Sequence, residues 1–109
     1  MRLKDGVKLL GIRPEMLVGL QIADTVYKAA GRELTVTSVS DGKHMRASAH
    51  YSGRAADLRI NDVPQVDRSG IVISLKMALG AEFDVIHENI GLATEHVHIE
   101  FDPSVGVGG

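Results

Sequence analysis

The sequence predicts an α+β domain, with a mainly antiparallel sheet and two principal helices. Three observations lead to this class. Several stretches alternate apolar and polar residues and are rich in β-branched side chains, two longer segments repeat apolar residues at helical spacing, and no linker divides the chain. Because the strands come in runs with the helices inserted between them, an α+β architecture is favoured.

The size and composition of the chain fit one domain. With 109 residues, 44% of them hydrophobic, the chain can bury a real core without disulfides. We expect this domain over residues 1–103, a flexible glycine-rich tail over residues 104–109, and a monomer in solution.

The charge and the cysteine content exclude several kinds of partner and site. The formal net charge is −2, and Lys and Arg form no run, which argues against nucleic acid or an anionic membrane as the main partner. The chain has no Cys, so only His, Asp and Glu remain as strong metal ligands.

The chain shows no targeting or membrane-spanning segment. Residues 1–6 lack the apolar core of a secretory signal, and no later stretch approaches the roughly 18 apolar residues of a membrane span. We therefore expect a protein that is made in the cytoplasm and has no membrane partner.

The first helix is expected from about Pro14 to Ala30. Proline suits the first turn of a helix, and Gly31 suits the position just after its end. The preceding apolar stretch, residues 7–12, fits an edge strand or a loop packed on the core. The apolar positions of the helix recur at helical spacing and are Leu17, Leu20, Ala23, Tyr27 and Ala30.

The second helix is expected between Pro64 and Gly80. Asn61 and Asp62 are residue types that cap helices, and Pro64 helps to start one. The apolar side chains available for burial on this helix are Val66, Ile73, Met77 and Leu79.

The strands follow from alternation and β-branched content. In the strand that precedes the second helix, Asp57 and Arg59 lie on the face opposite to the apolar residues. The expected strands cover residues 34–39, 55–60, 83–87 and 97–101.

Two short motifs carry the residues of a metal site. The first has the form S-x-H-x-x-G-x-A-x-D and is matched by Ser48, His50, Gly53, Ala55 and Asp57. The second fits both a [DE]-x-x-H and an H-x-H element and consists of Glu95, His96, Val97 and His98. Together the motifs supply two or three imidazoles and two carboxylates, the inventory of a catalytic zinc site.

In this order and combination, the motifs resemble the zinc D-Ala-D-Ala carboxypeptidase and L,D-endopeptidase family. These small peptidoglycan peptidases share a fold with the hedgehog signalling domain, and the resemblance covers roughly residues 37–102. It implies a zinc ion held by His50, Asp57 and His98. It also implies a general base at Glu95, which would take a proton from the metal-activated water as this water attacks an amide carbonyl.

The resemblance also assigns roles around these residues. Gly53 would let the backbone turn sharply, so that His50 and Asp57 can face one ion. His96 is expected beside the site, where it would bind the substrate or the tetrahedral intermediate; the alternative is that it replaces His98 as the ligand. Ser48 would either support a ligand by a hydrogen bond or only form a turn.

One departure from the family concerns the substrate. Many members carry an Arg shortly after a Thr-Ser pair, aimed at the substrate carboxylate or carbonyl. Here the pair at residues 37–38 is followed by Val, Ser and Asp. Arg46 is the nearest replacement, with Arg54 and Lys43 as further candidates.

The resemblance therefore predicts a zinc-dependent peptidase that cuts a bond next to a D-residue in peptidoglycan stem peptides, as a carboxypeptidase or an endopeptidase. Because no secretory signal is visible, delivery to the cell wall by a phage route or by another secretion route is expected. Two alternatives stay open. One is a non-catalytic, zinc-stabilised binding module of the same fold, and the other is a plain α+β domain with incidental histidines.

Overall fold

The computed structural model describes residues 1–39 and 53–103. It shows an α+β domain with a five-stranded sheet, which confirms the predicted class. The elements follow the chain as β1 (Arg2–Leu3), α1 (Pro14–Ala29), β2 (Thr35–Ser38), β3 (Ala55–Arg59), α2 (Gln65–Leu79), β4 (Phe83–Glu88) and β5 (His96–Phe101).

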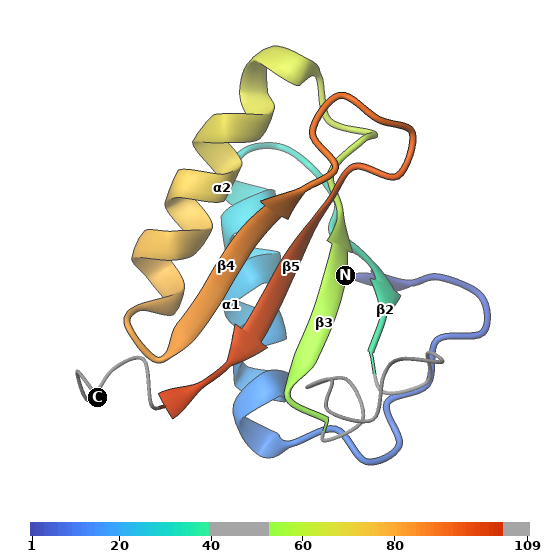
Figure 1. Ribbon diagram of the computed structural model, residues 1–109, viewed down its shortest axis with the longest axis vertical. Helices are drawn as coiled ribbons and strands as arrows, with labels where there is room; N and C mark the ends of the chain where they lie inside the picture. Colours follow the sequence, from blue (N-terminus) through green and yellow to red (C-terminus); the bar gives the residue numbers. More distant parts are fainter. Residues whose placement is uncertain (40–52, 104–109) are drawn as a thin grey trace.

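The sheet has the strand order β1-β2-β3-β5-β4. The β1–β2 pair is parallel, whereas β2–β3, β3–β5 and β4–β5 are antiparallel. Both helices lie against one face of the sheet (Figure 1), and in the part of the chain that the structure describes the other face carries no helix. We call this second face the open face.

The core lies between the helices and the sheet. Strand alternation sends every second side chain of β3, β4 and β5 towards the helices. The buried strand residues on this helix-covered face include Val36, Ala56, Leu58, Val85, Val97 and Ile99. The side chains between them in sequence therefore point to the open face.

Helix α1 begins at Pro14, as the sequence predicts, and Gly31 follows its end with a φ of 74°. Tyr27 is fully buried and its hydroxyl donates a hydrogen bond to the backbone oxygen of Arg59, 2.9 Å away. This bond joins α1 to β3. Two residues of the expected apolar face, Leu17 and Ala30, are exposed, and Ala30 caps the helix instead of belonging to it. The buried side of α1 consists of Met16, Gly19, Leu20, Ala23 and Tyr27.

Helix α2 differs from the expectation in its cap and in its buried face. The N-cap is Pro64, with no side-chain capping bond, so neither Asn61 nor Asp62 caps the helix. The expected core residues Val66, Ile73 and Met77 are exposed, and only Leu79 is buried as predicted. The apolar positions of α2 allow two faces, and the one that packs is the stripe Ile71, Val72, Leu75 and Leu79.

The segment before α1 is a loop that is packed on the core, so the loop alternative is correct for residues 7–12. Val7, Leu9 and Ile12 are partly buried against the core. The edge strand is instead the exposed pair Arg2–Leu3, which pairs with β2 and whose Arg2 N–H donates to the oxygen of Leu34, just before β2, at 2.8 Å. Neither described helix is long and apolar enough to cross a bilayer.

Candidate metal centre

Asp57 and His98 meet on the open face of the sheet. They are partners in the antiparallel register of β3 and β5. Because Ala56 and Leu58 point into the core, Asp57 points the opposite way, as does His98 between the buried Val97 and Ile99. The Asp57 Oδ1 atom lies 2.9 Å from His98 Nδ1.

His98 is held between two carboxylates. Its Nδ1 faces Asp57, and its Nε2 lies 3.1 Å from Glu100 Oε1. The hydrogen bond with Asp57 raises the pKa of His98 to about 9; burial lowers it, and Glu100 adds to the rise. His98 is therefore an imidazolium at neutral pH in the metal-free protein, and a metal ion bound to the ring would displace a proton.

Glu88 completes a group that could hold a metal ion. It is the last residue of β4, and it lies opposite His96 in the β4–β5 register. One ligand atom from each of Asp57, Glu88 and His98 lies within 4.8 Å of the other two. Two carboxylates and one imidazole are suitable ligands for a divalent metal.

His96 lies on the same face of the sheet, two residues before His98 in β5. Its Nδ1–H donates to Thr94 O at 2.8 Å, and its Nε2 faces Glu88 Oε1 at 3.1 Å and Asp57 Oδ1 at 3.7 Å. With Nδ1 protonated, the neutral ring directs a lone pair at these carboxylates, which only a further proton or a metal ion can bridge. Both imidazoles thus contact Asp57, and the choice of His98 over His96 as ligand stays a prediction.

Glu95, the expected general base, lies on the other side of the sheet. Its Oε2 accepts a hydrogen bond from His87 Nε2 at 2.7 Å, and its Oε1 accepts one from Arg68 Nη1 at 2.7 Å. Arg68 belongs to α2, and His87 alternates with Ile86 and Glu88, which point to the open face. The structure therefore does not bring Glu95 together with Asp57 and His98.

The surroundings of Glu95 keep it ionised. Burial would raise the pKa of this carboxyl, but the hydrogen bonds from the Gly91 N–H and from His87, with the charge of Arg68, outweigh burial and lower it. Only 3% of Glu95 is exposed. A carboxylate in this state is poorly suited to collect a proton from a water on the open face.

The first motif lies partly outside the described residues. His50, the third expected ligand, falls in the segment that is not described, as do Ser48 and Arg46. Gly53 is described, and its φ of 72° confirms that the motif needs glycine there. A Cβ on Gly53 would lie 2.1 Å from the backbone oxygen of Gly11, so the loop before α1 packs directly against the motif.

From the sequence, Glu88 and Glu100 are expected to be solvated or strand-end carboxylates, with support of a ligand or replacement of Glu95 as the base as the alternative roles. In the structure both lie beside the predicted ligands. Only the register of the β4–β5 hairpin, in which Glu88 faces His96, brings Glu88 to the site. An alternation count starting from His98 places Glu100 on the same face, and this is the signal that could have found it.

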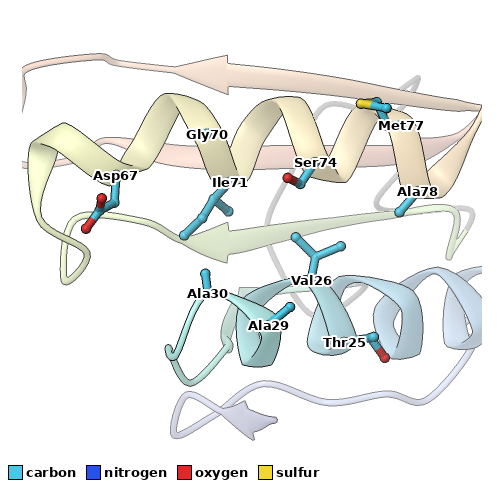
Figure 2. Close-up of a pocket in the computed structure, with 10 residues that line it drawn as sticks. All are labelled: Thr25, Val26, Ala29, Ala30, Asp67, Gly70, Ile71, Ser74, Met77 and Ala78. Carbon is cyan, nitrogen blue, oxygen red and sulfur yellow. The ribbon is translucent and has the colours of Figure 1, made fainter.

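A second concave feature lies on the far side of the molecule. Helices α1 and α2 enclose a groove of about 770 Å³ lined mainly by small and apolar side chains (Figure 2). Its polar lining consists of Thr25, Asp67 and Ser74. The groove contains no imidazole and none of the residues of the open-face cluster, so it is not the metal centre.

The fold and this cluster define a small α+β domain with a candidate metal site on the open face of its sheet. No protein-family model matches the chain, and no curated protein matches it. The assignment of a function therefore depends on the motifs and on the geometry of the cluster.

Proposed function

We propose that the protein is a zinc-dependent peptidase that hydrolyses an amide bond next to a D-residue in peptidoglycan stem peptides. One observation carries the proposal. Asp57 and His98 were chosen as ligands from two motifs far apart in sequence, and they are direct neighbours across β3 and β5, 2.9 Å apart. The substrate class is supported by the resemblance of the motifs.

The ligand set in this proposal is His50, Asp57 and His98. Imidazole nitrogen favours zinc over magnesium, which prefers oxygen ligands. A zinc ion held there would lower the pKa of a bound water and polarise the amide carbonyl. Two imidazoles and one carboxylate are a known ligand set for such catalytic sites.

We assign the general base to Glu88, because one of its carboxylate oxygens lies within 4.8 Å of ligand atoms of both Asp57 and His98, whereas Glu100 lies beside His98 and is not part of that group. Its carboxylate would accept the proton of the attacking water and return this proton to the nitrogen of the leaving amine. The side chain of Glu88 is 43% exposed, so water and substrate can reach it. Glu95, which the resemblance favours for this role, is buried on the other face.

His96 would bind the substrate in this scheme. Its Nδ1–H is held by Thr94 O, and its Nε2 is directed at the Asp57–Glu88 side of the cluster. Its unprotonated Nε2 would accept a hydrogen bond from an N–H or O–H group of the substrate.

The alternative function is a zinc-stabilised binding module without activity. It shares the ligands and differs in the use of Glu88. In a binding module, Glu88 would be a fourth ligand, which its place in the described three-residue group allows. A closed ligand set of this kind leaves no open position for a water.

A metal analysis followed by a digestion separates these functions. The protein is purified without chelator, its zinc content is measured, and it is incubated with defined muropeptides whose products are identified by mass spectrometry. Stoichiometric zinc and a product cut next to a D-residue support the peptidase, as does loss of cleavage in EDTA and its return with Zn²⁺ but not Mg²⁺. Zinc without cleavage indicates the binding module, and absence of zinc contradicts both.

A further inference from the structure

The carboxylate of Glu95 is the centre of a buried cluster on the helix-covered side of the sheet. Its Oε1 accepts hydrogen bonds from Arg68 Nη1 at 2.7 Å and from the Gly91 N–H at 3.1 Å, while its Oε2 is bound by His87 at 2.7 Å. Both oxygens are thus in use. A buried carboxylate that lost these partners would be strongly unfavourable, so the cluster fixes its members relative to one another.

Arg68 extends this cluster to the loop between β3 and α2. Its Nε–H donates to Val63 O at 2.7 Å, and its Nη2 donates to Asn61 O at 3.1 Å. The guanidinium therefore satisfies three acceptors at once, which a planar fork of N–H donors can do and a lysine ammonium cannot do in the same geometry. Asn61 adds a second link, because its Nδ2 donates to Ala93 O at 3.1 Å.

These contacts bind the β4–β5 loop at the point where β5 begins. Glu95 immediately precedes β5, and its N–H donates to Leu92 O at 3.1 Å. The residue before it, Thr94, supplies the carbonyl that accepts the Nδ1–H of His96. The position of the Thr94 carbonyl therefore sets the orientation of the His96 ring.

We propose that Arg68 is a positioning residue for the open face: through Glu95 it fixes the Thr94 carbonyl and the start of β5, and thereby the orientation of His96 and His98. The effect would cross the sheet, because Arg68 binds Glu95 on the helix-covered side just before β5, whereas the histidines project from the open face. Glu95 is in this scheme the link between Arg68 and the site, with no direct contact to substrate.

The consequence for zinc affinity rests on the proposed function, but the consequence for the His96 ring does not. Loss of Arg68 should free the β4–β5 loop and release the Nδ1 hydrogen bond of His96. If the open face binds zinc, the misplaced ligands should lower zinc affinity by about 10–100-fold, the usual effect of losing a partner that orients a ligand.

The test uses the full chain with Arg68→Met, Arg68→Lys and Glu95→Gln. The side-chain ¹⁵N and ¹H resonances of His96 and His98 are recorded in the zinc-free protein, and zinc affinity is measured by competition with a chelator. Val72→Ala is the matched control, because it shortens a buried side chain one turn further along α2 that is not among the hydrogen-bond partners of Glu95. Thermal melting of each variant measures its destabilisation, so that variants of comparable stability are compared.

Arg68→Met should move the His96 resonances to those of a ring without the Nδ1 hydrogen bond and weaken zinc binding, whereas Val72→Ala should do neither. Arg68→Lys, which keeps the charge, should give an intermediate change and serves where Arg68→Met does not fold.

The proposal is overturned if the Arg68 variants match Val72→Ala in both measurements. It is also overturned if Glu95→Gln abolishes cleavage while its resonances and zinc affinity stay unchanged, since Glu95 would then be the base. A wild-type chain that binds no zinc contradicts the proposed function, and the resonances still decide the role of Arg68.

Discussion

Asp57 of β3 and His98 of β5 face each other in register, with Asp57 Oδ1 2.9 Å from His98 Nδ1. The pairing arises because β5 is inserted between β3 and β4, so two motifs that are distant in sequence share one row across the sheet. His96 and Glu88 face each other in the neighbouring row of the same face. The described residues of the site thus lie on strands, which favours accurate placement of these ligands.

The first prediction concerns the ligands. Asp57→Ala, His98→Ala and His50→Ala should each reduce zinc affinity by more than the roughly 10–100-fold that loss of an outer partner costs. His96→Ala should reduce zinc affinity by no more than about 10–100-fold and should abolish cleavage. Zinc content after dialysis and competition titration provide the measurement. If His96→Ala empties the site and His98→Ala does not, the two histidines have exchanged roles.

The second prediction concerns Glu88. Glu88→Gln keeps the size of the side chain and removes its ability to accept a proton, so cleavage should fall by about 10²–10⁴-fold with zinc retained. Asp84→Asn is the control, since Asp84 lies on the same face of β4 and is exposed. Initial rates on a defined muropeptide measure both variants. A Glu88→Gln protein that cleaves at the wild-type rate would return the role of base to Glu95.

The third prediction is a pH dependence of the metal-free protein. The folded state raises the pKa of His98 to about 9, whereas an unfolded histidine titrates near 6.5. The protonated ring therefore stabilises the fold fully below about pH 6.5, and this contribution is lost as the pH rises through about 9. We expect it to be on the order of 1 kcal/mol, because solvent screens this partly exposed group.

Thermal or urea unfolding in EDTA between pH 6 and pH 10 measures this loss. The variant His98→Asn should show a smaller decrease over the same range, because the titrating ring is absent. Saturating zinc should also reduce the decrease, since a metal ion replaces the proton. An unchanged slope in His98→Asn would show that another group titrates.

The fourth prediction concerns the glycine of the first motif. Gly53→Ala should lower the free energy of unfolding by at least about 2 kcal/mol, because it combines a positive φ with a Cβ 2.1 Å from Gly11 O. Gly70→Ala is the control: its Cβ meets nothing within 4 Å in the middle of α2, and it should stabilise by about 0.5–1 kcal/mol. Urea unfolding measures both. Equal effects of the two substitutions would contradict the packing described here.

The sequence was sufficient for the class of fold because the strands alternate and both helices have strong signals at their ends. It could not show which apolar stripe of α2 packs, since Ile73 and Met77 are as apolar as the Ile71 and Leu75 that are buried. It also missed β1, because two exposed residues have no periodicity. Helix ends are local properties, whereas the packed face depends on the sheet.

For the site, the sequence predicted that Asp57 and His98 come together, and it could not predict which face Glu95 takes. The spacing Glu-x-x-His allowed Glu95 to reach the open face only if the chain bent at the start of β5. In the structure, Arg68 and His87 hold Glu95 on the helix-covered side. Both partners come from other elements, and nothing near Glu95 in the sequence indicates them.

One side of β5 packs in the core and the other carries the site. The number of residues at the start of β5 therefore decides which side chains face the core. Val97 and Ile99 are fully buried, while His96 and His98 alternate with them. One residue inserted between Glu95 and His96 would move each histidine into a core position and each aliphatic side chain to the open face. A two-residue insertion there would restore the alternation but shift the histidines relative to Asp57. An insertion within the loop residues 89–94 should instead leave the register of β5 intact.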